Sequence, residues 1–269
     1  MSLGKGLPNL GNTCYVNSVL QCLRYSKELV YMLKSHNTEN DSPLVASLVE
    51  LLYADSPIQN LYTLIRELGK TSEFKIMKQC DAHELVLYLL DTMFTELKYS
   101  NPFEGKMLST ITCTKCQHQS KTNYPYITVS LQIPDVNQPV KIEDLLEEFC
   151  KEEMLDTPIE CEKCETKTQS QKQLGVEPGS VVIVHLKRFQ GNCKINTPIE
   201  MKPEIEIMDK AYRLYAACNH SGNTFGGHYT AACMKRDGSW SLCNDKEVHP
   251  LASIPSESDR PYVLFYCKI

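Results

Sequence analysis

Two C-x-x-C pairs constrain what this chain can fold into more than any other feature of its sequence: Cys113 with Cys116, and Cys161 with Cys164. Four thiolates at this spacing form a closed tetrahedral site for one structural Zn²⁺ ion, because no coordination position remains for water. Redox activity is the alternative for a single pair, but two pairs with lysine and glutamate between the cysteines favour zinc. The long segment between the pairs predicts that they lie at the tips of two separate hairpins. Two nearby residues are possible substitute ligands, His118 and Cys150.

The remaining cysteines and the charge balance limit the class of protein. The chain has 269 residues and 13 cysteines, an odd number that excludes a fully paired secreted framework. We find no apolar run of the roughly 18 residues that span a bilayer, and no secretory signal at the N-terminus. A net charge of -5 argues against nucleic acid or an anionic membrane as the main partner. We therefore expect a cytoplasmic or nuclear protein.

Leucine stripes with helical spacing fill the first third of the chain. They predict helices over 44–52 and 61–68, the second stopped by Gly69, and a longer helix over 81–97. Asp81 followed three residues later by Glu84 is a capping-box pattern for that longer helix. The first third is therefore predicted to be an α-rich lobe.

The pattern changes to β-branched runs from about residue 109. One short helix is expected over 142–149, and the strands are spaced as in an antiparallel meander without crossover helices. The fold class is therefore α+β in one domain, with a helical lobe over 1–105 and a β-rich part over 106–269. The predicted strands cover 126–133, 181–189, 212–220, 228–234, 239–244 and 262–267.

A turn-rich loop at 6–13 runs directly into a predicted amphipathic helix. Val16, Val19 and Leu20 fall on one helical face, and Asn12 or Thr13 is the expected N-cap. Cys14 then lies in the first helical turn, where free backbone amides and the helix dipole favour a thiolate. A cysteine nucleophile at a helix start is one interpretation, and a small buried side chain is the other.

A cysteine nucleophile needs a base, and seven histidines compete for this role. His228 is favoured because it follows two glycines and opens a predicted strand, so an extended ligand can pass close to the backbone there. A hairpin to the next strand would bring Asn244 or Asp245 beside it, and either could fix the imidazole tautomer. The competing histidines are His36, His83, His185, His220 and His249, besides His118.

Taken together, these blocks resemble the ubiquitin-specific protease family, papain-like cysteine peptidases that remove ubiquitin. The stretch 6–21 matches the family's GLxNxGNTCYxNSxLQ pattern almost without a gap, and the resemblance covers nearly the whole chain in the family's order. The other matching blocks are 226–231, 240–248, 186–189, 195–198, 262–266 and the paired C-x-x-C knuckles.

The resemblance implies a helical thumb, an antiparallel β palm and zinc-bearing β fingers, with ubiquitin held between them. It implies Cys14 as nucleophile, His228 as base and Asn244 or Asp245 as third member of the triad. Asn9 matches the position that stabilises the oxyanion. The implied channel for the ubiquitin tail is lined by Gln79, Asp81, Glu84, Gly226 and Gly227, where Asp81 would meet an arginine.

Two positions depart from the family pattern. Cys80 stands where a second glutamine is usual, and Cys243 replaces an aromatic residue. Three alternatives stay open: a peptidase for a ubiquitin-like modifier, a catalytically silent ubiquitin-binding scaffold, and a zinc-dependent redox protein. The expected partners are ubiquitin and ubiquitinated proteins, and the residues do not say whether an activating partner is needed.

Overall fold

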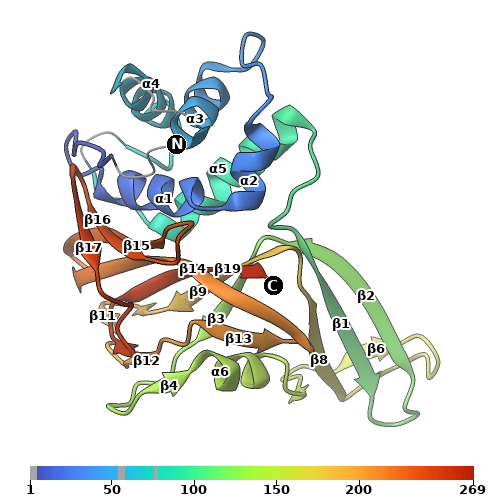
Figure 1. Ribbon diagram of the computed structural model, residues 1–269. Helices are drawn as coiled ribbons and strands as arrows, with labels where there is room; N and C mark the ends of the chain where they lie inside the picture. Colours follow the sequence, from blue (N-terminus) through green and yellow to red (C-terminus); the bar gives the residue numbers. More distant parts are fainter. Residues whose placement is uncertain (1–4, 54–57, 76–77) are drawn as a thin grey trace.

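The computed structural model describes residues 5–53, 58–75 and 78–269, and its first part is a helical lobe (Figure 1). The four helices predicted in this lobe are confirmed, but α2 was not predicted; the Ser26 side chain caps it by accepting from the Leu29 amide. None of the helices in the described ranges is long and apolar enough to cross a membrane. The helices of the lobe are α1 (Cys14–Arg24), α2 (Lys27–Leu33), α3 (Pro43–Tyr53), α4 (Ile58–Leu68) and α5 (Ala82–Leu97).

An eight-stranded sheet forms the second part, in the order β17-β16-β15-β14-β19-β9-β3, with β13 pairing to β14. The predicted meander holds from β14 to β17, but the C-terminal strand β19 inserts between β14 and β9, and β3 runs parallel to β9. All other pairs in this sheet are antiparallel. The strands are β3 (Thr128–Gln132), β9 (Val181–Lys187), β13 (Glu204–Ile207), β14 (Lys210–Asn223), β15 (Gly226–Met234), β16 (Trp240–Asn244), β17 (Glu247–Leu251) and β19 (Pro261–Lys268).

A second sheet, in the order β2-β1-β8-β5, extends away from the helical lobe with the β6–β7 hairpin at its far end (Figure 1). Its strands are β1 (Gly105–Cys113), β2 (Gln119–Tyr126), β5 (Glu153–Met154), β6 (Ile159–Cys161), β7 (Thr166–Thr168) and β8 (Ser170–Glu177). The shorter elements are α6 (Ile142–Phe149), β4 (Val140–Lys141), β10 (Phe189–Gln190), β11 (Cys193–Lys194), β12 (Ile199–Glu200) and β18 (Glu257–Ser258).

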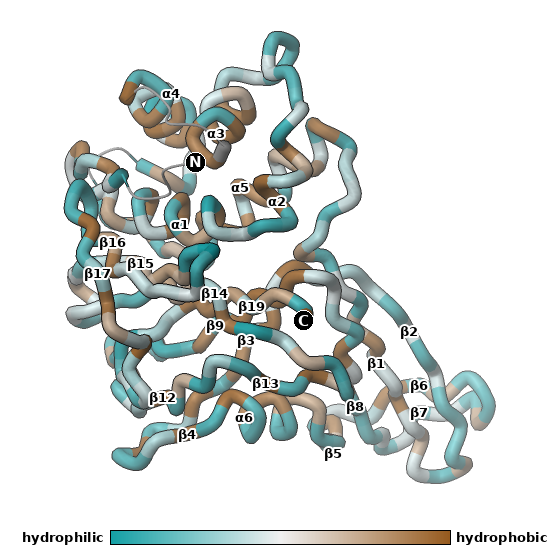
Figure 2. Tube along the Cα trace, in the orientation of Figure 1, coloured by the Kyte–Doolittle hydropathy of each residue, from teal (hydrophilic) through white to brown (hydrophobic). Residues whose placement is uncertain are grey.

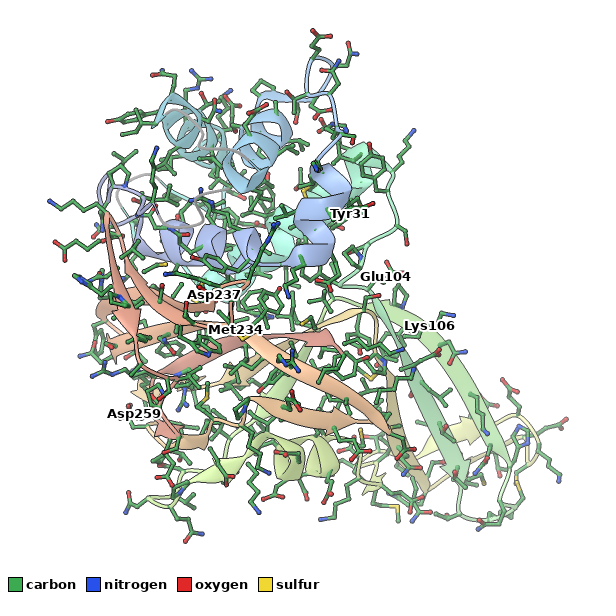
Figure 3. All side chains as sticks on the ribbon, viewed as in Figure 1. Tyr31, Glu104, Lys106, Met234, Asp237 and Asp259 are labelled. Carbon is green, nitrogen blue, oxygen red and sulfur yellow. The ribbon has the colours of Figure 1, made fainter. Side chains whose placement is uncertain are left out.

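The main sheet is covered on both faces, which explains the continuous apolar run of β19. Val263 and Phe265 pack with the helical lobe, while Leu264 and Tyr266 point to the opposite core with α6. Met234 at the end of β15 contacts both cores, and it lies below the helical lobe in Figure 3. The alternation of side chains along a strand therefore divides one apolar sequence between two cores. Figure 2 shows brown, hydrophobic segments both in the helical lobe and in α6.

Helix α1 is buried along its whole length, because it lies against the sheet on one side and against other helices and the loop at residues 5–13 on the others. Its periodic apolar face was predicted correctly, but its polar face does not meet solvent. Gln21 on that face donates to the Lys5 carbonyl at 3.0 Å. The polar residues of α1 thus hold the loop that precedes Cys14.

Candidate active site

Cys14 is the first residue of α1, as predicted, with Thr13 at the N-cap. The Thr13 hydroxyl does not cap the helix; it accepts from the Leu10 amide at 2.9 Å and thereby orders the preceding loop. The Cys14 side chain is buried, 3% exposed, and it lies at the positive end of the helix dipole. The Cys14 thiol therefore lies beside the free backbone amides of the first turn of α1.

The His228 side chain, near the start of β15, lies with its Nε2 2.6 Å from Asn244 Oδ1, within hydrogen-bond distance. The register of β15 with β16 brings the two residues together, since Ala231 pairs with Cys243. An amide oxygen only accepts, so Nε2 carries the proton and Nδ1 of the neutral ring keeps its lone pair. The sequence left Asn244 and Asp245 open as partners of His228, and the structure brings Asn244 to the ring.

Asp245 lies in the turn between β16 and β17 and contacts the loop before Cys14 instead. One carboxylate oxygen accepts from Asn9 Nδ2 at 3.0 Å, and the other accepts from Asn17 Nδ2 at 2.8 Å. Asn9 Oδ1 in turn accepts from the amides of Gly11 and Thr13. The Asn9 carboxamide is thereby fixed at both ends, with its NH₂ group directed toward Asp245.

Gln79 bridges the two lobes beside Cys14. Its Nε2 lies 3.5 Å from Cys14 Sγ and donates to the Gly227 carbonyl at 2.5 Å, while its Oε1 accepts from the Gly227 amide at 2.9 Å. A carboxamide with this pair of bonds occupies the place of a peptide group, so an extended peptide could take the same partners. Glycine is required at position 227, since a Cβ there would collide with the His220 ring.

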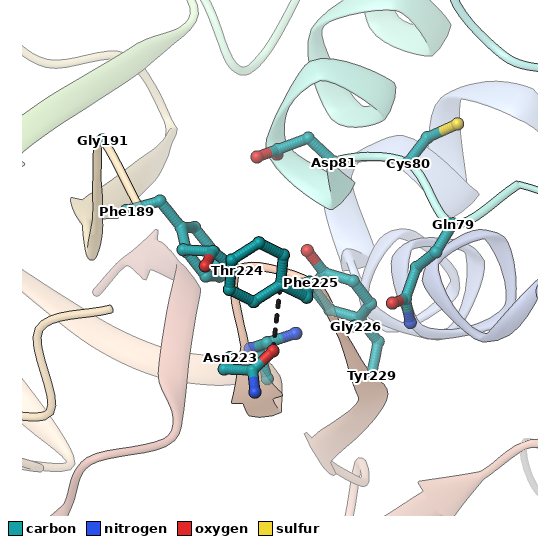
Figure 4. Close-up of a pocket in the computed structure, with 11 residues that line it drawn as sticks. Gln79, Cys80, Asp81, Phe189, Gly191, Asn223, Thr224, Phe225, Gly226 and Tyr229 are labelled. Atoms are coloured by element: carbon teal, nitrogen blue, oxygen red, sulfur yellow. Dashed lines mark hydrogen bonds between the residues drawn. The ribbon is translucent and has the colours of Figure 1, made fainter. Parts of the chain in front are cut away.

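A cavity of about 310 Å³ adjoins this bridge and is shown in Figure 4. Gln79, Cys80 and Asp81 border it from the helical side, Tyr229 comes from β15 of the main sheet, and Phe189 comes from β10 (Figure 4). Phe225 in the β14–β15 turn is 85% exposed at its edge. Predicted channel residues Gln79, Asp81 and Gly226 are thus brought together around this cavity, with Gly227 beside it.

Asp81 confirms the predicted capping role. Its side chain accepts from the amides of His83 and Glu84 at the start of α5, and its second oxygen accepts from the Tyr262 hydroxyl at 2.5 Å. Asp81 and Glu84 also border a neighbouring cavity of about 520 Å³. Burial, followed by the charge of Asp81, raises the pKa of Glu84. Two carboxyl groups therefore lie at the border of that cavity.

The four predicted metal ligands meet at the far end of the second sheet. Cys113 and Cys116 come from the β1–β2 turn, Cys161 and Cys164 from the β6–β7 hairpin, and their sulfurs lie within 4.8 Å of one another. Within the described residues this cluster includes neither His118 nor Cys150. The pairs therefore lie on two separate hairpins, as predicted, and the cluster could hold a metal ion.

The chemistry of these thiols fits a cation. A hydrogen bond from Thr168, and then the Cys116 amide, lower the pKa of Cys113 to about 6. Hydrogen bonding to Cys116, and then burial, raise the pKa of Cys164 to about 12. Four sulfurs this close cannot all ionise without a positive charge between them, and a divalent ion supplies that charge.

Two residues of the site were not singled out from the sequence. Asn17 lies one turn after Cys14 and contacts Asp245, and Tyr262 contacts Asp81. A polar residue at i+3 from the candidate nucleophile was a visible signal for Asn17. Tyr262 falls in the block 262–266 that resembles the family, but no local pattern indicated its contact with Asp81, which lies 181 residues away.

Comparison with known proteins agrees with this geometry. Residues 5–266 match the family model described as "Ubiquitin carboxyl-terminal hydrolase". The chain is 29% identical to human "Ubiquitin carboxyl-terminal hydrolase 2", over 97% of this chain and 54% of that protein. It is 30% identical to the chicken protein of the same description, over 97% of this chain and 92% of that one. The chain thus spans about half the length of the human relative.

The fold also matches solved structures. One is described as the "SAGA Ubp8/Sgf11/Sus1/Sgf73 DUB module bound to ubiquitin aldehyde", with a TM-score of 0.86 at 25% identity, over 98% of this chain and 69% of that chain. This likeness confirms the α+β fold class predicted from the sequence. Because the family model spans almost every residue, this chain belongs to the ubiquitin carboxyl-terminal hydrolase family.

Proposed function

We propose that this chain is a deubiquitinating thiol protease domain that hydrolyses the isopeptide or peptide bond after the C-terminal glycine of ubiquitin. The observation that carries the proposal is the 2.6 Å hydrogen bond between His228 and Asn244, in a chain of this family whose first helix starts at Cys14. A ubiquitin-aldehyde complex of a similar fold supports ubiquitin as the ligand.

In the proposed mechanism, His228 Nδ1 takes the proton of Cys14, and the thiolate attacks the carbonyl carbon of the terminal glycine. Asn9 and backbone amides stabilise the oxyanion, Asp245 holds Asn9, and His228 returns the proton to the leaving lysine amine. Water then attacks the thioester with His228 as base. Asn244 keeps the imidazole in the tautomer that leaves Nδ1 free to accept.

We propose that the tail of ubiquitin enters between the helical lobe and the sheet, with Gln79, Gly226 and Gly227 around its glycines. For the tail to enter, the Gln79 side chain must break its two hydrogen bonds to the Gly227 amide and carbonyl. These backbone groups then bind the backbone of the tail. Asp81 and Glu84 would then meet a basic side chain of the tail. A Cβ at position 227 would collide with His220 and the Ser221 carbonyl, so only glycine keeps the Gly227 backbone in this position beside Gln79.

The proposed metal is one Zn²⁺ ion held by Cys113, Cys116, Cys161 and Cys164. Such an ion supplies a structural cross-link between the two hairpins, because all four coordination positions are taken by sulfur. We further propose a reducing compartment, the cytoplasm or the nucleus, since a thiol nucleophile and four thiolate ligands both require reduced sulfur.

Hydrolysis of a fluorogenic ubiquitin C-terminal amide by the purified chain tests the proposal. We expect turnover by the wild type and none by Cys14→Ala, which should still bind ubiquitin in a pull-down. The same amide of a ubiquitin-like modifier is the control for substrate class. Turnover that persists in Cys14→Ala, or a preference for the modifier, would contradict the proposal.

A further inference from the structure

Asn17 is a polar residue in the interior of the molecule that the proposed mechanism does not use. It lies on α1, one turn after Cys14, and only 2% of its surface is exposed. Its Nδ2 group faces three acceptors: the carbonyls of Leu7 at 3.1 Å and Pro8 at 3.2 Å, and Asp245 Oδ1 at 2.8 Å. The NH₂ group of Asn17 thus ties α1 to the loop before the nucleophile and to the β16–β17 turn.

The other end of the same carboxamide has no partner. Asn17 Oδ1 is buried and accepts no hydrogen bond from any described residue. The reverse orientation would place this oxygen against three acceptors, so the chemistry of the site fixes which way the group points. A buried acceptor without a donor destabilises the folded state, and an apolar side chain would avoid this loss. The position therefore requires the NH₂ group itself.

Asp245 connects Asn17 to Asn9 through hydrogen bonds to both side chains. Its second carboxylate oxygen accepts from Asn9 Nδ2 at 3.0 Å, and its backbone carbonyl accepts from the Leu7 amide at 2.8 Å. Asp245 also has a left-handed backbone with φ of 51°, so the turn is held in a less favoured conformation by these contacts. A continuous chain of hydrogen bonds therefore runs from Asn17 through Asp245 to Asn9.

We propose that Asn17 is a positioning residue, which holds the Asp245 carboxylate so that the Asn9 amide is aligned with the oxyanion. This inference rests on the proposed function, in which Asn9 stabilises the oxyanion. Asn17 does not touch the substrate. It acts on the step in which negative charge develops on the carbonyl oxygen, and not on binding or on formation of the thiolate.

Asn17→Ala is the first test, with Gln21→Ala as matched control. Both side chains lie on α1, both are buried, and both donate to the loop at 5–9, but Gln21 contacts only the Lys5 carbonyl among the acceptors described. We expect Asn17→Ala to lower kcat on the ubiquitin amide about 10-fold or more, with KM within about twofold. Gln21→Ala should keep kcat within about twofold of wild type.

A second measurement separates positioning from a general loss of structure. Alkylation of Cys14 by iodoacetamide needs the thiolate but develops no oxyanion, so Asn17→Ala should alkylate at the wild-type rate. In the Asp245→Ala background, Asn17→Ala should cause no further loss of kcat, because its route to Asn9 is already cut. Should Asn17→Ala not fold, Asn17→Ser enters the same comparison, because it removes the reach of the carboxamide with a smaller change in polarity.

Three results would overturn the inference: unchanged kcat in Asn17→Ala, an equal fall in alkylation, or the same fold loss in the Asp245→Ala background. These outcomes are distinct from failure of the proposed function. A wild type that does not hydrolyse the ubiquitin amide overturns that function, whereas an active wild type matched by Asn17→Ala overturns only the role of Asn17.

Discussion

The contacts of His228 predict that Asn244, and not Asp245, sets the orientation of the imidazole. In Asn244→Ala the Nε2–H group loses its acceptor at 2.6 Å in a half-buried site. An N–H left unpaired in such a place costs about 1–2 kcal/mol, and at about 1.4 kcal/mol per factor of ten this lowers kcat about 5- to 30-fold. Asn244→Asp keeps an acceptor at the same position and is the matched control, expected to stay near wild type.

Two assays distinguish the residues at the end of β16. Hydrolysis of the ubiquitin amide depends on both the thiolate and the oxyanion, whereas iodoacetamide alkylation of Cys14, followed by mass spectrometry of its peptide, depends on the thiolate alone. Asn244→Ala should slow both reactions. Asp245→Ala should slow hydrolysis only, because Asp245 contacts Asn9 and not His228. The reasoning is refuted if Asp245→Ala slows alkylation while Asn244→Ala leaves it unchanged.

Four further predictions follow from other contacts. Without substrate, Gln79→Ala should increase the rate of Cys14 alkylation by iodoacetamide several-fold, because the Gln79 carboxamide lies against the sulfur. Gln117→Ala is the control, and a slower alkylation in Gln79→Ala than in this control would contradict the prediction. Gly227→Ala should abolish hydrolysis and lower the melting temperature, since its methyl collides with His220, whereas Gly175→Ala finds ordinary contacts on Leu108. Removal of the metal by a chelator, or Cys116→Ser, should lower the melting temperature, and metal analysis should find about one zinc per chain. Burial, and then His83, lower the pKa of His185 to about 3, so the unfolded chain binds this proton first. The free energy of unfolding should therefore fall from about pH 6.5 toward 3, by up to about 1.4 kcal/mol per pH unit from this group. In urea unfolding, His185→Phe should reduce this slope, with burial of His220 and His83 supplying the rest, whereas the exposed His249→Phe should leave it unchanged.

Local patterns in the sequence were sufficient for four of the five helices of the helical lobe, all but α2, and for the candidate catalytic and metal-binding residues. The leucine stripes predicted both ends of α3 and α5 to within one residue and the end of α4, which begins three residues before its predicted start, and the Asp81 cap was visible from its spacing to Glu84. The C-x-x-C spacing predicted two hairpins that share one cluster of sulfurs. These features were accessible because each depends on residues within about one turn or one hairpin of one another.

The order of the sheet was beyond such patterns. β19 is last in the chain, yet it inserts between β14 and β9 and is buried on both faces. Its apolar run is typical of a central strand, but it does not indicate which strands pair with it, because pairing depends on the register over the whole sheet. The parallel pairing of β3 with β9 was missed for the same reason, because α6 and two strands of the second sheet, β5 and β8, lie between them in the chain.

The sequence by itself determined which residues could do chemistry: a cysteine at the start of a helix, a histidine after two glycines, and an asparagine and an aspartate at the end of the next strand. Only the tertiary structure decided which of these residues contact one another. Asn244 bonds His228 across one hairpin, while Asp245 bonds Asn9 and Asn17, which lie 236 and 228 residues away. Adjacent residues at a turn point in different directions, and which partner each one meets depends on where distant segments pack, so no local pattern could assign them.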